Sequence, residues 1–179
     1  LPLGVEGFGE WMDIDFYESI EPEIIKAKLQ EVLPKGIKLI NANVIPIKAH
    51  SLSQELASAI WSFNLTSIKE PAPSKLELQT AIDSILGSEE LIWKDVNKKG
   101  RPRMRNFRQQ LSSLQILISQ ETQSELHYLQ RVRLQLNTLI DPIGRSIKPI
   151  QIKYWLEKYL GQSLEISDVK RDEIQLLQC

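Results

Sequence analysis

Two segments with strong helical patterns, each lying between strand-like segments, constrain the fold of this chain most. In residues 74–87 apolar side chains recur with a helical period, Ser74 and Glu77 have the spacing of a capping box, and glycine ends the pattern. Residues 149–161 repeat the signal, with proline at the start and glycine at the end. A helix with one apolar face must cover another layer, so we expect both helices to lie on a sheet.

Alternating apolar and polar residues predict the strands of that sheet. Residues 59–65 give the clearest strand, and residues 91–96 and 101–106 predict a hairpin around Gly100. The other alternating stretches are residues 114–118, 128–136 and 164–170, with a loop at 120–125. This order predicts an α+β fold for residues 58–179: a ferredoxin-like split βαβ sandwich with an inserted basic hairpin, in which helices cover one face of an antiparallel sheet.

The first 57 residues give a shorter pattern, one strand–helix–strand unit. Met12, Ile14 and Phe16 alternate with acids and predict a strand, and a helix is expected from Pro22 until the proline and glycine at positions 34 and 36. Residues 37–47 predict a second strand with a bulge, and the capping box of residues 51–54 predicts one or two helical turns. We therefore expect residues 1–57 to form half of a split βαβ unit.

Charge is distributed unevenly along the chain. The formal net charge is −1, yet residues 97–108 contain six basic side chains and no acid, which leaves −7 for the remainder. Residues 1–33 hold eight acids against two lysines. A hairpin rich in Arg and Lys can contact successive phosphates, and Trp93 and Phe107 beside it can stack on unpaired bases. The predicted nucleic-acid-binding residues are Lys98, Lys99, Arg101, Arg103, Arg105, Arg108, Arg131 and Arg133.

Three other interpretations of the basic hairpin stay open: it pairs with the chain's own acidic end, it binds the acidic surface of a partner protein, or it is only solvated. No catalytic constellation is predicted. Glu10, Asp13 and Asp15 are a candidate cation or acid/base group, although a solvated strand face explains them as well. Neither of the two histidines has further ligands at metal spacing, so no metal site is assigned.

The composition also bears on the setting of the protein. No apolar run approaches the roughly 18–20 residues of a membrane span, so no membrane partner is expected. The single cysteine, Cys179, fits a cytoplasmic protein without an intramolecular disulfide.

The first third of the chain also resembles a known family. The stretches LPLGVEGFGEWMDIDF and EPEIIKAKLQEVLPKGIKLINANVIPIKAHSLSQELASAIWSFNL resemble the uncharacterised domain fused to, or encoded beside, radical SAM proteins. Residues 48–52 read KAHSL, where the family pattern is KAPSL-like, and the later part matches more loosely. Such domains carry a further strand–helix–strand before LPLGVE, so the resemblance implies that residues 1–57 are the second half of a truncated ferredoxin-like module.

The resemblance implies a radical SAM protein as partner. It implies an iron–sulfur cluster and SAM only for that fused or partner module, because one cysteine cannot supply the several thiolates that a cluster needs. The expected function is a non-catalytic accessory domain that binds RNA, with RNA modification as the family-level expectation. The alternative is a protein–protein adaptor that docks the radical SAM core.

Overall fold

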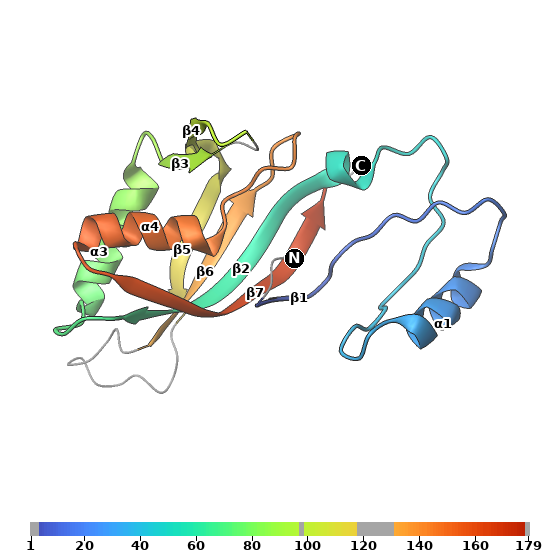
Figure 1. Ribbon diagram of the computed structural model, residues 1–179, viewed down its shortest axis with the longest axis horizontal. Coiled ribbons are helices and arrows are strands. Elements are labelled where there is room, and N and C mark those ends of the chain that lie inside the picture. Colours follow the sequence, from blue (N-terminus) through green and yellow to red (C-terminus); the bar gives the residue numbers. More distant parts are fainter. Residues whose placement is uncertain (1–3, 97–98, 118–130, 178–179) are drawn as a thin grey trace.

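The computed structural model describes residues 4–96, 99–117 and 131–177 (Figure 1). A five-stranded sheet has the order β1-β7-β2-β6-β5, and a separate two-stranded sheet pairs β3 with β4. The strands are β1 (Val5–Gly7), β2 (Leu56–Ser67), β3 (Ile92–Val96), β4 (Pro102–Asn106), β5 (Leu111–Leu117), β6 (Val132–Leu139) and β7 (Leu164–Leu176). The helices are α1 (Pro22–Val32), α2 (Leu52–Glu55), α3 (Lys75–Gly87) and α4 (Pro149–Leu160), with a short 3₁₀ turn, η1 (Arg108–Gln110).

The predicted α+β class is confirmed, as are helices on one face of a mostly antiparallel sheet. The chain runs β2-α3-β5-β6-α4-β7, and β7, β2, β6 and β5 are neighbours in that order with antiparallel pairing throughout. This is the arrangement of a split βαβ unit. The second strand of the unit is β5 rather than residues 91–96, because β3 and β4 pair only with each other.

The core lies between the sheet and its two helices. Along β2 the apolar side chains of Trp61, Phe63 and Leu65 point to the helical layer and are almost fully buried. They meet the apolar face of α3 and that of α4, which includes Ile152 and Leu156. Burying these stripes supplies most of the hydrophobic stabilisation, at about 1.5–3 kcal/mol for each large aliphatic side chain.

Both core helices have the ends that the sequence predicts. At the start of α3, the Ser74 N–H donates to Glu77 Oε2 at 2.8 Å, and the Glu77 N–H donates to Ser74 Oγ at 3.3 Å. At the end of α4, Gly161 adopts φ 65° and its N–H donates to Glu157 O at 2.9 Å. Only glycine enters this left-handed conformation without strain, so it ends the helix sharply.

The hairpin formed by β3, β4 and their connection, residues 92–106, is called the basic hairpin below. It is inserted between α3 and β5 and lies beside the helical layer (Figure 1). Trp155 Nε1 of α4 donates to Ile92 O at 3.2 Å, and the rings of Trp93 and Tyr154 meet edge to face with centroids 5.2 Å apart. The hairpin is thus fixed to α4 at its base.

The N-terminal part differs from the prediction. Residues 12–16 and 37–47 form no strand; the N-terminal strand that the described residues contain is β1, which pairs in parallel with β7. Helix α1 forms as predicted, but none of its residues is buried, and it is set apart from the sheet (Figure 1). Alternation produces a strand only when a neighbouring strand takes up the backbone hydrogen bonds, and in the described chain neither segment has one.

Several strand boundaries also differ from the prediction. Strand β7 extends to Leu176, six residues beyond its predicted end, because the long β2 pairs along its length. The predicted loop at 120–125, the start of the strand predicted at 128–136 and the end of that at 114–118 lie outside the described residues.

Candidate nucleic-acid interface

The arginines of the basic hairpin differ in their exposure to solvent. Trp93 and Arg105 are cross-strand neighbours, as are Asp95 and Arg103, so these four side chains share one face of the ribbon. Arg105 Nη2 lies 3.3 Å from Asp95 Oδ2, and both side chains are partly buried. Of the arginines predicted to bind nucleic acid, Arg105 is therefore held by the hairpin's own carboxylate.

The remaining cations of the basic hairpin are at the surface. Arg103 is exposed, and so are Lys94 on the opposite face and Lys99 and Arg101 near the turn. In its described residues the hairpin has five basic side chains and a single acid, Asp95, which already binds Arg105. The ribbon thus presents an excess of positive charge to solvent. Lys98 lies outside the described residues.

One of the two predicted stacking residues is available. Trp93 is partly exposed, and its edge-to-face partner Tyr154 is 41% exposed. Phe107, by contrast, is 4% exposed and belongs to the core, so the prediction that it stacks on a base is wrong. The sequence predicts Tyr154 within a helix but not beside the hairpin, because that position depends on how α4 packs.

Arg108 is bound to the backbone of its own chain. Its guanidinium donates to three carbonyl oxygens: Ser88 O at 2.8 Å, Leu86 O at 2.9 Å and Leu111 O at 3.3 Å. Two of these carbonyls lie at the C-terminal end of α3, where helix carbonyls lack intrahelical partners and a cation is favoured. The structure thus places Arg108 in a helix-capping position rather than on the hairpin surface.

Arg133 lies on the other side of the sheet. Its neighbours along β6, Leu134 and Val132, are buried under the helices, so Arg133 points to the open face. There it donates to Asp168 Oδ2 at 2.6 Å and to Ser62 Oγ at 2.7 Å. Arg131 is exposed just before β6. The structure therefore does not join these two arginines to the basic hairpin in one surface, because the hairpin packs on α4, across the sheet.

A β-bulge builds the network around Arg133. Between Ser167 and Lys170, β7 has one residue more than β2 opposite it, and Asp168 within this stretch has φ 48°. The bulge turns the Asp168 carboxylate toward Arg133, whose hydrogen bond is the main cause that lowers the pKa of Asp168 below its ordinary value. Sequence reasoning missed this network because alternation predicts the face of Arg133 but not a bulge in another strand.

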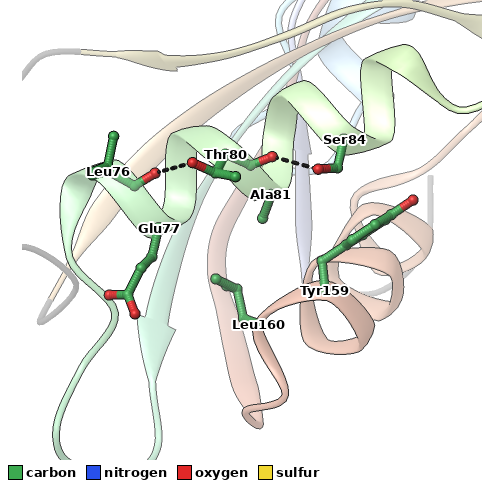
Figure 2. Close-up of a pocket in the computed structure, with 7 residues that line it drawn as sticks. All are labelled: Leu76, Glu77, Thr80, Ala81, Ser84, Tyr159 and Leu160. Atoms are coloured by element: carbon green, nitrogen blue, oxygen red, sulfur yellow. Dashed lines mark hydrogen bonds between the residues drawn. The ribbon is translucent and has the colours of Figure 1, made fainter.

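A groove between α3 and α4 is the other feature that could hold a ligand (Figure 2). It has a volume of about 340 Å³ and is lined by Leu76, Thr80, Ser84, Tyr159 and neighbours. The hydroxyls of Thr80 and Ser84 donate to carbonyls one turn earlier in α3. The carboxylate of Glu77 accepts from Ser74, chiefly from its N–H, and this lowers its pKa. The lining therefore offers no base paired with a nucleophile.

The acidic residues near the N-terminus do not converge on one point. Glu10 pairs with Arg171, and Asp13 accepts a hydrogen bond from the Leu52 N–H at 2.9 Å. Within the described residues, no three His, Cys, Asp or Glu side chains are close enough to hold a metal ion. No helix in that part of the chain is long and apolar enough to cross a membrane.

Comparison with known proteins gives one informative match. A search of functionally curated proteins finds none. A chain in the crystal structure of a Cbf5-Nop10-Gar1 complex is similar over 66% of this chain and 31% of its own length, with a TM-score of 0.42 and 14% identity, a likeness too low to support an argument. A family model matches residues 1–142, most of the sequence. The chain therefore belongs to this family, DUF2344, which is described as an uncharacterized protein conserved in bacteria.

Proposed function

We propose that this chain is a non-catalytic accessory domain of a radical SAM system and that it binds RNA through the basic hairpin. The radical SAM part rests on the resemblance of the LPLGVE segment and the segment that follows it. The RNA part rests on the surface described above. The iron–sulfur cluster and SAM would belong to the fused or partner module, since the sequence has one cysteine.

One observation carries the proposal for RNA: Lys94 and Arg103 are exposed on the two faces of the basic hairpin, and Lys99 and Arg101 are exposed near its turn. The rest of the chain is acidic overall, so this positive charge is local. A local cationic ribbon attracts a phosphate backbone, and arginine offers each phosphate a planar pair of donors.

The neighbouring aromatic pair favours an unpaired strand over a duplex. Tyr154 and Trp93 lie at the base of the same ribbon, and Tyr154 has exposed ring surface. Bases that are not paired can stack on such rings, which contributes about 1–3 kcal/mol per base. Duplex RNA offers mainly its shape and backbone to a protein.

Binding of a fluorescent oligouridine, followed by anisotropy over a salt series, tests the proposal. We expect affinity to fall with salt, with a slope of about −0.7 for each phosphate contact. In the variant Lys94→Gln/Arg101→Gln/Arg103→Gln the slope should become shallower by about 2.

The matched control removes three charges far from the hairpin, in Lys35→Gln/Lys38→Gln/Lys48→Gln, where all three lysines are exposed. This control should bind like the original chain. Absence of binding at low salt, or equal loss in the hairpin variant and the control, would contradict RNA binding by the hairpin.

A second candidate, a protein–protein adaptor, is favoured by a different observation. Residues 8–47 expose many large apolar side chains, among them Met12, Tyr17, Ile40 and Val44. Exposed apolar side chains in such number are typical of an interaction surface. Co-purification with a radical SAM protein after nuclease treatment would support the adaptor, and clean separation would count against it.

A further inference from the structure

A segment of the chain, residues 8–24, combines exposed apolar side chains with charge of one sign. We call it the acidic segment. It contains six acids and no Lys or Arg. Between these acids, Trp11, Met12 and Phe16 are 51%, 64% and 46% exposed. An extended stretch with alternating acidic and apolar residues has the composition of a half-buried strand, so its apolar side chains are suited to burial against a partner.

The acidic segment is held beside the sheet without belonging to it. The Phe8 N–H donates to Arg171 O at 2.8 Å, and Trp11 Nε1 donates to Ile174 O at 3.2 Å, both on β7. Asp13 accepts from the Leu52 N–H. Beyond these contacts, residues 11–16 make no backbone hydrogen bond to another described segment. Among the described residues no backbone group pairs with their N–H and C=O groups, so a further strand can use them.

The return segment, residues 37–47, likewise exposes apolar side chains and forms no strand. Ile40, Val44 and Ile47 are 70%, 77% and 105% exposed, although the sequence alternates like a strand. Its contacts with α1 include two hydrogen bonds of the Gln30 side chain, to Ile37 O at 3.0 Å and from the Leu39 N–H at 2.8 Å. Two strand-forming segments and the helix between them thus remain without a covering layer among the described residues.

We propose that the acidic segment and the return segment are a docking surface for a basic, strand-forming segment of a partner polypeptide. The partner strand would take up the unpaired backbone groups and bury the apolar side chains between the acids, as in other cases of strand addition. Its Lys or Arg residues would lie opposite Asp15 and Glu18, because opposite charges on neighbouring strands stabilise their pairing.

Charge argues against a second copy of this chain as the partner. Two acidic segments side by side would place six acids opposite six, and like charges on neighbouring strands are destabilising. The two strands of the basic hairpin, β3 and β4, are already paired with each other, and the base of the hairpin is packed on α4. A copy could offer them only by unfolding the hairpin.

This inference rests on the adaptor candidate and gives its partner a chemistry; it is independent of RNA binding. The test mixes the complete chain with a synthetic peptide of alternating Lys and Val, and with a matched peptide of alternating Glu and Val. Affinity is measured by calorimetry and backbone protection by hydrogen exchange. We expect the basic peptide to bind, the acidic one not to bind, and new protection to appear at residues 11–16 or 38–45.

Charge reversal supplies the specificity test. In Asp15→Lys/Glu18→Lys the affinity for the basic peptide should fall by about tenfold or more. The control Glu89→Lys/Glu90→Lys reverses two exposed acids beside the basic hairpin and should retain the affinity.

Four results would overturn the inference: no binding of the basic peptide, equal binding of both peptides, binding without new protection in the two segments, or equal loss in both variants. A concentration-dependent dimer in sedimentation that already protects residues 11–16 would assign the surface to a second copy. If peptide binding fails while a radical SAM protein still co-purifies, strand pairing is excluded and the adaptor function remains.

Discussion

Replacing Arg108 by alanine should destabilise the fold and leave RNA binding intact. The guanidinium satisfies carbonyl oxygens of Leu86, Ser88 and Leu111 at 2.9, 2.8 and 3.3 Å, and so connects the end of α3 to the start of β5. A hydrogen bond from a charged donor contributes about 1.5–3 kcal/mol. Two of the three bonds are short, and water can replace part of the loss because the site is partly exposed. We therefore expect a loss of about 3 kcal/mol in the free energy of unfolding.

Urea unfolding measures this quantity. The midpoint should fall while the m value stays constant, since a changed m value would indicate a change in the unfolded or native state instead. Arg108→Lys should recover part of the stability, because an ammonium can reach one carbonyl but not three. Arg103→Ala is the matched control; its side chain is exposed, so the change should stay within about 0.5 kcal/mol.

RNA affinity of the folded variants separates a capping role from a phosphate contact. Arg108→Ala should bind oligouridine like the original chain, whereas Arg103→Ala should bind more weakly. A loss of stability below about 1 kcal/mol, outside the range for a charged hydrogen-bond donor, would refute the capping role. Equal loss of RNA affinity in both variants would show that Arg108 contacts the phosphate backbone.

Three further predictions concern stability. Ser74→Ala removes the N-cap of α3 and should cost about 1 kcal/mol in urea unfolding; no change would contradict the cap. Gly161→Ala places a Cβ on a residue with φ 65° and should cost about 1 kcal/mol. Because no other atom lies within 4 Å of the added Cβ, this cost comes from the backbone conformation, and a neutral result would contradict that explanation. The depressed pKa of Asp168 means that its ionised carboxylate stabilises the fold above its unfolded pKa, about 3.9, and that this stabilisation is lost as the pH falls through the folded value. In Asp168→Asn the melting temperature should therefore fall less steeply as the pH is lowered into the acidic range. An unchanged pH dependence would contradict the ion pair with Arg133.

Local signals in the sequence predicted much of the fold. Ser74, Glu77 and Gly161 fix helix ends through contacts within a few residues, so their roles could be read directly. The order of strands and helices then predicted the split βαβ arrangement, because few arrangements let two amphipathic helices cover one sheet. The two N-terminal strands were predicted wrongly, since alternation reports a strand-forming tendency and not the presence of a neighbour.

The candidate site was harder to predict than the fold. The excess of positive charge in the hairpin is a property of the sequence, but the partner of each cation is a property of the packing. Arg105 meets Asp95 across the ribbon, Arg108 reaches the end of α3, and Arg133 meets Asp168 only because a bulge turns that carboxylate. The contacts of Arg108 with Leu86 and of Arg133 with Asp168 join residues 22 and 35 positions apart, which no local pattern records.

Photo-crosslinking of a 4-thiouridine oligonucleotide to the complete chain tests the central claim most directly. Mass spectrometry of the digested product identifies the residues that touch the bases. The account predicts crosslinks in residues 92–106 and at Tyr154, lost at high salt because the phosphate contacts are electrostatic. Crosslinks confined to the open face of the sheet around Arg133, or none at low salt, would contradict it.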